Sequence, residues 1–281
     1  MVLGCGSTEP LRIAALTFSS AANPPVVAEP TYETVARAAE ITSIAAVKLP
    51  LTPQGVHDVE KMVEAAKKTS AGLLYLCNPA NPTGTIVTKD QLAWVVDNLP
   101  ASTVLLCDEA YIDFVEDARY QSAVPHLKAG RRVVIIKTFS KIYGLAGMRL
   151  GYALGPAELI ERMRGQMLGG MGINQAVVAG VFAGLEDRET YNRVKRENAF
   201  VRRYVVEGFR QMGYSCFESH TNFVMADLKR PVVPVAEKLI EKGFGVGRVF
   251  PSMPNHMRVT LGTMSDMQRF LPALRDILGA G

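Results

Sequence analysis

Residues 133–152 of this chain read VVIIKTFSKIYGLAGMRLGY. The apolar run 133–136 predicts a buried strand, and a loop rich in hydroxyl groups follows it. Lys141 lies in that loop between apolar neighbours and should lose hydration, which lowers the pKa of an ammonium group. A neutral amine is the form of lysine that makes a Schiff base with an aldehyde. We therefore expect Lys141 to be chemically reactive, although a lone Ser-Lys pair is more often a solvated turn.

The same stretch contains groups that bind anions. Thr138, Ser140 and Arg149 offer the hydrogen-bond donors and the positive charge that a phosphate monoester requires. Their position directly around Lys141 predicts that a phosphate group lies close to the reactive amine.

A second candidate anion site lies near the N-terminus, where residues 4–10 read GCGSTEP. Glycine, Ser/Thr, Glu and Pro ahead of an apolar periodic stretch are typical of a helix N-terminus. Such an end presents free N–H groups and a positive dipole to an anion. Gly6, Ser7 and Thr8 could form a phosphate cradle, and a capped helix that binds nothing is equally compatible with this stretch alone.

Two further polar groups follow apolar runs that predict strands of a parallel sheet. The run 72–77 ends in NPANPTG, a turn that exposes Asn81 at the carboxyl edge of the sheet, where open α/β folds bind ligands. The run 103–107 ends in Asp108, a carboxylate that needs a cationic or hydrogen-bonding partner if it is buried. Tyr111 follows three residues later.

Together, and in this order, these motifs resemble those of the fold-type-I, pyridoxal-phosphate-dependent aminotransferases, most closely the histidinol-phosphate aminotransferase branch. The resemblance implies an α/β protein with an aspartate-aminotransferase-like, three-layer αβα large domain and a smaller α+β C-terminal domain. We expect the boundary near Gly172, which gives a cofactor-binding domain over residues 1–172 and a small domain over residues 173–281.

In the second half, the hydrophobic pattern predicts helices and short strands. The expected helices are 156–168, 174–185, 189–212, 232–242 and 265–278, and the expected strands are 214–217, 223–226, 245–249 and 257–261.

The resemblance also implies roles for individual residues in a pyridoxal 5'-phosphate site. Lys141 would form the Schiff base and transfer a proton, and Asp108 would hold the proton on the pyridine nitrogen. Asn81 and Tyr111 would bind the ring oxygen. The expected phosphate ligands are Gly6, Ser7, Thr8, Thr138, Ser140 and Arg149.

Three residues are expected near the ring or the substrate. Tyr32, in the sequence Glu29-Pro30-Thr31-Tyr32, would stack on the pyridine, although an aromatic residue after a strand is more often plain core. Arg258 matches the arginine that binds the substrate anion in this family, with Arg248 as a looser match, and Asn81 would also contact the substrate. A solvent-exposed arginine on an edge strand is the alternative for Arg258.

The implied reaction moves an amino group between an amino acid or amino-alcohol phosphate and a 2-oxo acid such as 2-oxoglutarate, in a homodimeric enzyme of amino-acid biosynthesis. Two alternatives share the same site. One is a decarboxylase of the threonine-phosphate type, and the other is a truncated, non-catalytic protein that binds the cofactor. A Rossmann dehydrogenase is disfavoured, because no G-x-G-x-x-G follows a predicted strand.

Composition narrows the remaining classes of function. The chain has 281 residues and a net charge of +4 with scattered Lys and Arg, which does not support nucleic-acid binding. No apolar run is long enough for a membrane span, and the N-terminus does not resemble a signal peptide. The four cysteines lie far apart, and His57, His126, His220 and His256 lack ligand spacing, so we predict no metal site and a cytoplasmic location.

The N-terminus departs from the family pattern. In relatives, a preceding segment supplies an arm, pocket residues and a tyrosine that reaches the phosphate across the dimer interface. This chain begins almost at the phosphate loop, so we expect a fragment, a misplaced start or a shortened member, from which a leader could also have been lost.

Overall fold

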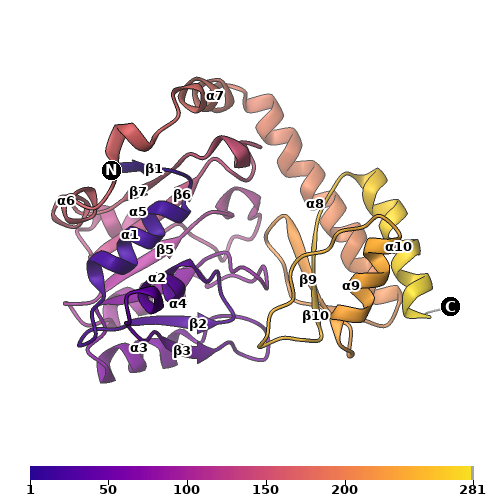
Figure 1. Ribbon diagram of the computed structural model, residues 1–281, viewed down its shortest axis with the longest axis horizontal. Coiled ribbons are helices and arrows are strands. Elements are labelled where there is room, and N and C mark those ends of the chain that lie inside the picture. The colour runs from indigo at the N-terminus through magenta and orange to yellow at the C-terminus, as the bar shows by residue number, and fades with distance from the viewer. Residues whose placement is uncertain (280–281) are drawn as a thin grey trace.

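The computed structural model describes residues 1–279, and a seven-stranded sheet forms its larger part (Figure 1). Its strands are β1 (Val2–Gly4), β2 (Pro25–Glu29), β3 (Val47–Pro50), β4 (Leu73–Cys77), β5 (Val104–Asp108), β6 (Val133–Thr138) and β7 (Gly151–Leu154). Their spatial order is β1-β7-β6-β5-β4-β2-β3. Strands β2 to β6 run parallel to one another, and β7 runs antiparallel to both β6 and β1.

Helices cover both faces of this first sheet, because its central strands are apolar on both sides. On β4, Leu73 and Tyr75 pack with α1 (Thr8–Phe18), α2 (Thr34–Ile41) and α6 (Ala157–Arg164). Leu74 and Leu76, which alternate with them, pack against α3 (Val59–Lys68) and α4 (Lys89–Asn98). The short helix α5 (Val124–Lys128) lies on this second face too. The structure thus has the expected three-layer αβα arrangement.

The rest of the chain forms a smaller unit around a second sheet. Its strands, in the order β10-β9-β8, are antiparallel and comprise β8 (Ser215–Cys216), β9 (Phe223–Asp227) and β10 (His256–Thr260). Helix α7 (Gln175–Glu186) leads into the long helix α8 (Arg188–Gln211), which crosses to this sheet (Figure 1). Helices α8, α9 (Val232–Glu241) and α10 (Met264–Leu278) cover one face of the sheet. The domain boundary near Gly172 stays a prediction; residues Gly169–Gly172 form a 3-10 turn there.

The structure corrects one predicted strand and adds elements that the hydrophobic pattern did not reveal. Residues 245–249 do not form a strand, although a backbone hydrogen bond from Gly247 to Arg258 (3.2 Å) ties them to β10. Two glycines weaken strand formation there, and Arg248 turns towards the first sheet instead. The short elements β1, β7 and α5 were missed, because three to five residues carry too little periodicity to be recognised.

The fold brings the carboxyl ends of three parallel strands to one edge of the first sheet. Cys77 at the end of β4 is paired with Asp108 at the end of β5, and β6 ends beside them at Thr138. Strands β9 and β10 face this edge, so the site lies between the two sheets. Within residues 1–279, no helix has the length and apolar character needed to cross a bilayer.

Candidate active site

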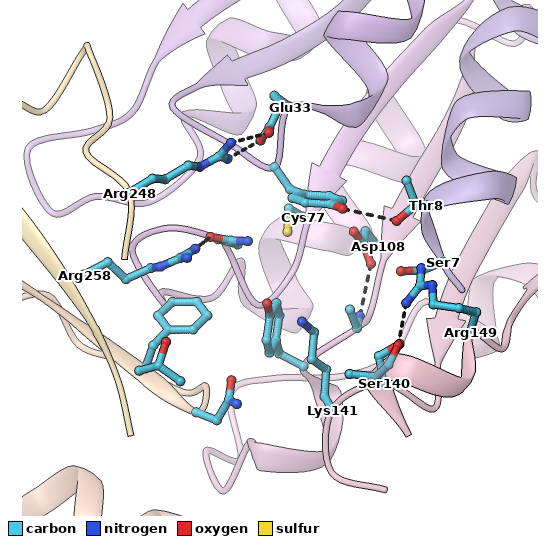
Figure 2. A pocket seen from close by; sticks show the side chains of 18 residues that line it. Ser7, Thr8, Glu33, Cys77, Asp108, Ser140, Lys141, Arg149, Arg248 and Arg258 are labelled. Carbon is cyan, nitrogen blue, oxygen red and sulfur yellow. Dashed lines mark hydrogen bonds and ion pairs between the residues drawn. The ribbon is translucent and has the colours of Figure 1, made fainter. Parts of the chain in front are cut away.

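A cavity of about 390 Å³ lies between the two sheets and collects most of the predicted site residues (Figure 2). Eleven of the thirteen line its wall: Ser7, Thr8, Tyr32, Asn81, Asp108, Tyr111, Ser140, Lys141, Arg149, Arg248 and Arg258. Gly6 and Thr138 do not line it, but both support residues that do. The predicted constellation is therefore brought together in space by segments far apart in the sequence.

Lys141 reaches into this cavity from the loop after β6. Its Nζ lies 5.1 Å from the centroid of the Tyr111 ring, over the face of the ring. Burial lowers the pKa of Lys141 below its ordinary value of 10.5, and Asp108 acts in the opposite direction. The expected desolvation is present, and it favours the neutral amine that attacks a carbonyl.

Asp108 is held at the floor of the cavity by two donors. Its Oδ2 accepts a hydrogen bond from the Tyr75 hydroxyl (3.1 Å), and its Oδ1 accepts one from the backbone N–H of Ala110 (3.1 Å). Burial raises the pKa of Asp108 to about 6, while both hydrogen bonds and nearby Lys141 lower it. A carboxylate in this position is suited to a cationic ring nitrogen, which would replace the solvation that burial removes.

Arg149 is aimed at the N-terminus of α1 by an unusual backbone conformation. It ends a short 3-10 turn (Ala146–Met148) in the left-handed region, with φ 63°. Its guanidinium donates to the carbonyl oxygens of Ala146 (2.8 Å) and Cys5 (3.4 Å) and lies against Gly6. A Cβ at Gly6 would collide with the guanidinium, so the glycine permits this close approach.

Hydroxyl groups complete this end of the cavity. Ser7 precedes α1, and Ser140 and Thr8 face the same space. Thr138 Oγ1 lies 2.9 Å from Ser140 Oγ and 3.1 Å from Ser140 N, from which it accepts a hydrogen bond. Thr138 therefore positions Ser140, and a direct contact from Thr138 to a phosphate remains a prediction. Helix N–H groups, hydroxyls and a guanidinium together form an anion site.

At the opposite end, two arginines enter from the second sheet and its preceding segment (Figure 2). Arg258 on β10 donates from Nη1 to Asn81 Oδ1 at 2.5 Å, and its buried Nε has no hydrogen-bond partner among residues 1–279. Arg248 donates through both Nη atoms to the carboxylate of Glu33. Both guanidiniums lie over the Phe250 ring, at 5.5 Å and 5.0 Å from its centroid.

Tyr32 forms part of the wall between the two ends of the cavity. Its hydroxyl lies 3.2 Å from Thr8 Oγ1, and its ring is half-buried. Ala110, which follows Asp108 and Glu109 in the sequence, also lines the cavity. A flat ring could be held here with its polar edge towards Asp108.

The sequence did not single out several residues that line the cavity: Glu33, Cys77, Ala110, Asn222, Phe223 and Thr260. It also missed Tyr75, which lies behind Asp108. One signal was available for Tyr75, because a buried tyrosine in an otherwise apolar strand needs a partner for its hydroxyl. For Glu33 no local signal existed, since its partner Arg248 lies 215 positions away.

One group of possible metal ligands lies outside this cavity. Asp117, Glu218 and His220 come close together, but Arg119 already contacts both carboxylates, at 2.6 Å and 3.1 Å. The guanidinium thus offsets one of the two negative charges of this cluster. The structural role expected for His220 stays a prediction.

The donor set of the cavity fits pyridoxal phosphate. The anion site suits a phosphate, Lys141 an aldehyde, and Asp108 a protonated pyridine nitrogen. The buried Arg258 Nε, which lacks a partner among the residues that the structure describes, points to a further anionic group at the other end.

Comparison with known proteins agrees with this geometry. Residues 1–274 match the family model for class I and II aminotransferases. A histidinol-phosphate aminotransferase from Caldicellulosiruptor saccharolyticus is 31% identical over 280 residues, which cover 99% of this chain and 77% of the relative.

Two crystal structures share the fold. An Erwinia carotovora atroseptica protein, assigned as a histidinol-phosphate aminotransferase, superposes with a TM-score of 0.94 at 31% identity, over 98% of this chain and 80% of that one. The histidinol-phosphate aminotransferase of Sinorhizobium meliloti, solved with pyridoxal-5'-phosphate, gives 0.88 at 24% identity, over 99% and 76%. The chain belongs to the class I and II aminotransferase family.

Proposed function

We propose that this protein is a pyridoxal-phosphate-dependent aminotransferase that moves an amino group from a histidinol-phosphate-like donor to a 2-oxo acid such as 2-oxoglutarate. One observation carries the proposal: a desolvated lysine, a buried carboxylate and an arginine-based anion site line one cavity in a chain of this family.

Bound pyridoxal phosphate supplies an aldehyde and an electron-withdrawing ring. Lys141 Nζ, as a neutral amine, would hold the aldehyde carbon and would accept and return a proton. Asp108 would hold a positive charge in place at the floor of the cavity, and Asn81 and Tyr111 would orient the ring. Burial raises the pKa of the Tyr111 phenol, which therefore remains a hydrogen-bond donor at neutral pH.

One end of the cavity would bind the cofactor phosphate, and the other end would bind the anionic group of the substrate. Ser7, Thr8, Ser140 and Arg149 would hold the cofactor phosphate, with Gly6 and Thr138 supporting them. Arg258, with Asn81, would bind the anionic group of the substrate, and Arg248 lies next to it on the Phe250 ring. The names of the relatives support a phosphate-bearing donor.

The homodimer, the domain boundary near residue 172 and the cytoplasmic location also belong to this proposal. Exposed apolar side chains support an interface near α7 and the turn before it, where Leu168, Met171 and Phe182 face solvent. An interface there would cover side chains that a monomer leaves in water.

A single-turnover donor screen tests the function. Purified protein loaded with pyridoxal phosphate is mixed with histidinol phosphate, aromatic amino acids, glutamate or threonine phosphate, and pyridoxamine phosphate formation is measured. We expect histidinol phosphate and glutamate to react. Carbon dioxide release without pyridoxamine phosphate would favour the decarboxylase, and no conversion with any donor would contradict the aminotransferase.

A further inference from the structure

Glu33, next to the first sheet, and Arg248, in the smaller unit, form an ion pair across the cavity (Figure 2). Glu33 directly precedes α2, beside Tyr32, and Arg248 lies in the irregular segment before β10. Both side chains line the cavity that contains Lys141, and they remain 38% and 49% exposed. The Glu33 carboxylate is therefore bound to the Arg248 guanidinium, which faces the space expected for the substrate.

The two arginines at this end differ in their partners. Arg258 donates to the neutral amide of Asn81, and its Nε lacks a partner among the described residues, so its charge remains available. Arg248 donates to both oxygens of Glu33, and the same contact lowers the pKa of Glu33 and keeps that carboxyl ionised at neutral pH. Because both guanidiniums lie over Phe250, a substrate with two anionic groups could meet both.

An anion that reaches Arg248 must displace Glu33 or bind beside a like charge. Displacement is possible, because a solvent-exposed ion pair stabilises by only about 0.2–1 kcal/mol. The cost falls on any second anion that reaches Arg248, because each one displaces the same ion pair. A substrate with a single anionic group that binds Arg258 does not meet this cost.

We propose that Glu33 is a specificity-determining residue, whose carboxylate occupies Arg248 in place of the distal anion of the substrate and so favours substrates with one anionic group over dicarboxylates. The inference rests on the proposed function, because it assumes that the substrate anions bind at this end of the cavity. It adds a competing charge to the binding contacts described above.

Binding of two unreactive, length-matched probes tests this role without turnover. Glutarate carries two carboxylates, and pentanoate carries a methyl group in place of one of them. Dissociation constants are measured by calorimetry at pH 8 on the pyridoxal-phosphate-loaded protein, for the wild type and for Glu33→Gln. Glutamine keeps the shape of glutamate and removes its charge.

We expect Glu33→Gln to tighten glutarate binding about two- to fivefold and to leave pentanoate binding unchanged. The difference in affinity between the two probes should grow accordingly. Weaker binding of glutarate would show instead that Glu33 holds Arg248 in place. An equal change for both probes, or no change, would also overturn the proposal.

Glu29→Gln is the matched control. Glu29 lies four residues earlier at the end of β2, and its carboxylate accepts from the Ser252 hydroxyl (3.3 Å) instead of from an arginine. This variant should leave both dissociation constants unchanged. If Glu33→Gln proves unstable, Arg248→Gln gives the second test, since removing Arg248 should weaken the binding of glutarate and leave that of pentanoate unchanged.

The outcome is separable from that of the donor screen. Tighter binding of glutarate, but not of pentanoate, in Glu33→Gln supports the role of Glu33 even if no donor reacts. Turnover of donors without this selective change leaves the aminotransferase in place and removes Glu33 as a determinant.

Discussion

Tyr75 on β4 donates a hydrogen bond to Asp108 on the neighbouring strand β5, with the hydroxyl 3.1 Å from Oδ2 and both side chains buried. The phenol thus positions the carboxylate from the side opposite to the cavity. It also lowers the pKa of Asp108, against the effect of burial.

Tyr75→Phe should therefore weaken cofactor binding. Loss of one buried hydrogen bond costs about 0.5–1.5 kcal/mol, which corresponds to a two- to tenfold weaker affinity for pyridoxal phosphate. Because the bond lowers the pKa of Asp108, its removal should also shift the acid limb of cofactor binding to higher pH. Fluorescence titration across pH measures both effects.

Tyr191→Phe is the control for this change. Tyr191 donates a hydrogen bond to Asp113 (2.8 Å), and neither residue lines the cavity. The substitution therefore removes a similar tyrosine–aspartate hydrogen bond away from the site. Equal losses of cofactor affinity in both variants would show that Tyr75 acts only through general stability.

Asp108→Asn should stabilise the cofactor-free protein at neutral pH. Burial raises the pKa of Asp108 from 3.8 to about 6, so the folded chain holds this proton more tightly than the unfolded chain does. Asp108 therefore costs stability above about pH 6, on the order of 3 kcal/mol, and the cost disappears below about pH 4. The gain in Tm should be larger at pH 7.5 than at pH 4.5, while transamination is lost. A lower Tm at pH 7.5 would contradict the electrostatic role.

Gly6→Ala should weaken cofactor binding more than its backbone strain alone explains. Gly6 has φ +69°, and an added Cβ would push against the Arg149 guanidinium. Gly144→Ala is a close control, since it has the same φ, +69°, and among residues 1–279 nothing lies within 4 Å of its added Cβ. Both variants should lose about 1–2 kcal/mol of stability. Only Gly6→Ala should bind pyridoxal phosphate less tightly. Equal affinities of the two variants for pyridoxal phosphate would argue against a contact between Arg149 and the phosphate.

Arg258→Ala should raise the KM for 2-oxoglutarate at least tenfold, which corresponds to about 1.4 kcal/mol or more of lost charge-assisted binding. Steady-state kinetics with a reactive donor give this value. Arg269→Ala, which removes an exposed arginine paired with Asp266 on α10, should leave KM unchanged. An unchanged KM in Arg258→Ala would remove this residue from the substrate site.

The sequence predicted the large parallel sheet and most of the residues that line the candidate site, because strong local signals mark both. The Asn81 turn, Asp108 and Lys141 each follow an apolar strand, and parallel strands end at the same edge. The missed features depend on contacts distant in sequence. Arg248 was expected on a strand, but its contact with Glu33 lies across the cavity, and no local pattern contains that information.

Borohydride reduction of the pyridoxal-phosphate-loaded protein, followed by peptide mass spectrometry, tests the central claim most directly. We expect the reduced cofactor on Lys141 and none in Lys141→Ala. Lys137 is the internal comparison, because it lies on the same strand-and-loop segment but pairs with buried Glu109 at 3.1 Å. A label on Lys137 or another lysine, or a label that persists in Lys141→Ala, would contradict the assignment of Lys141 as the cofactor-binding residue.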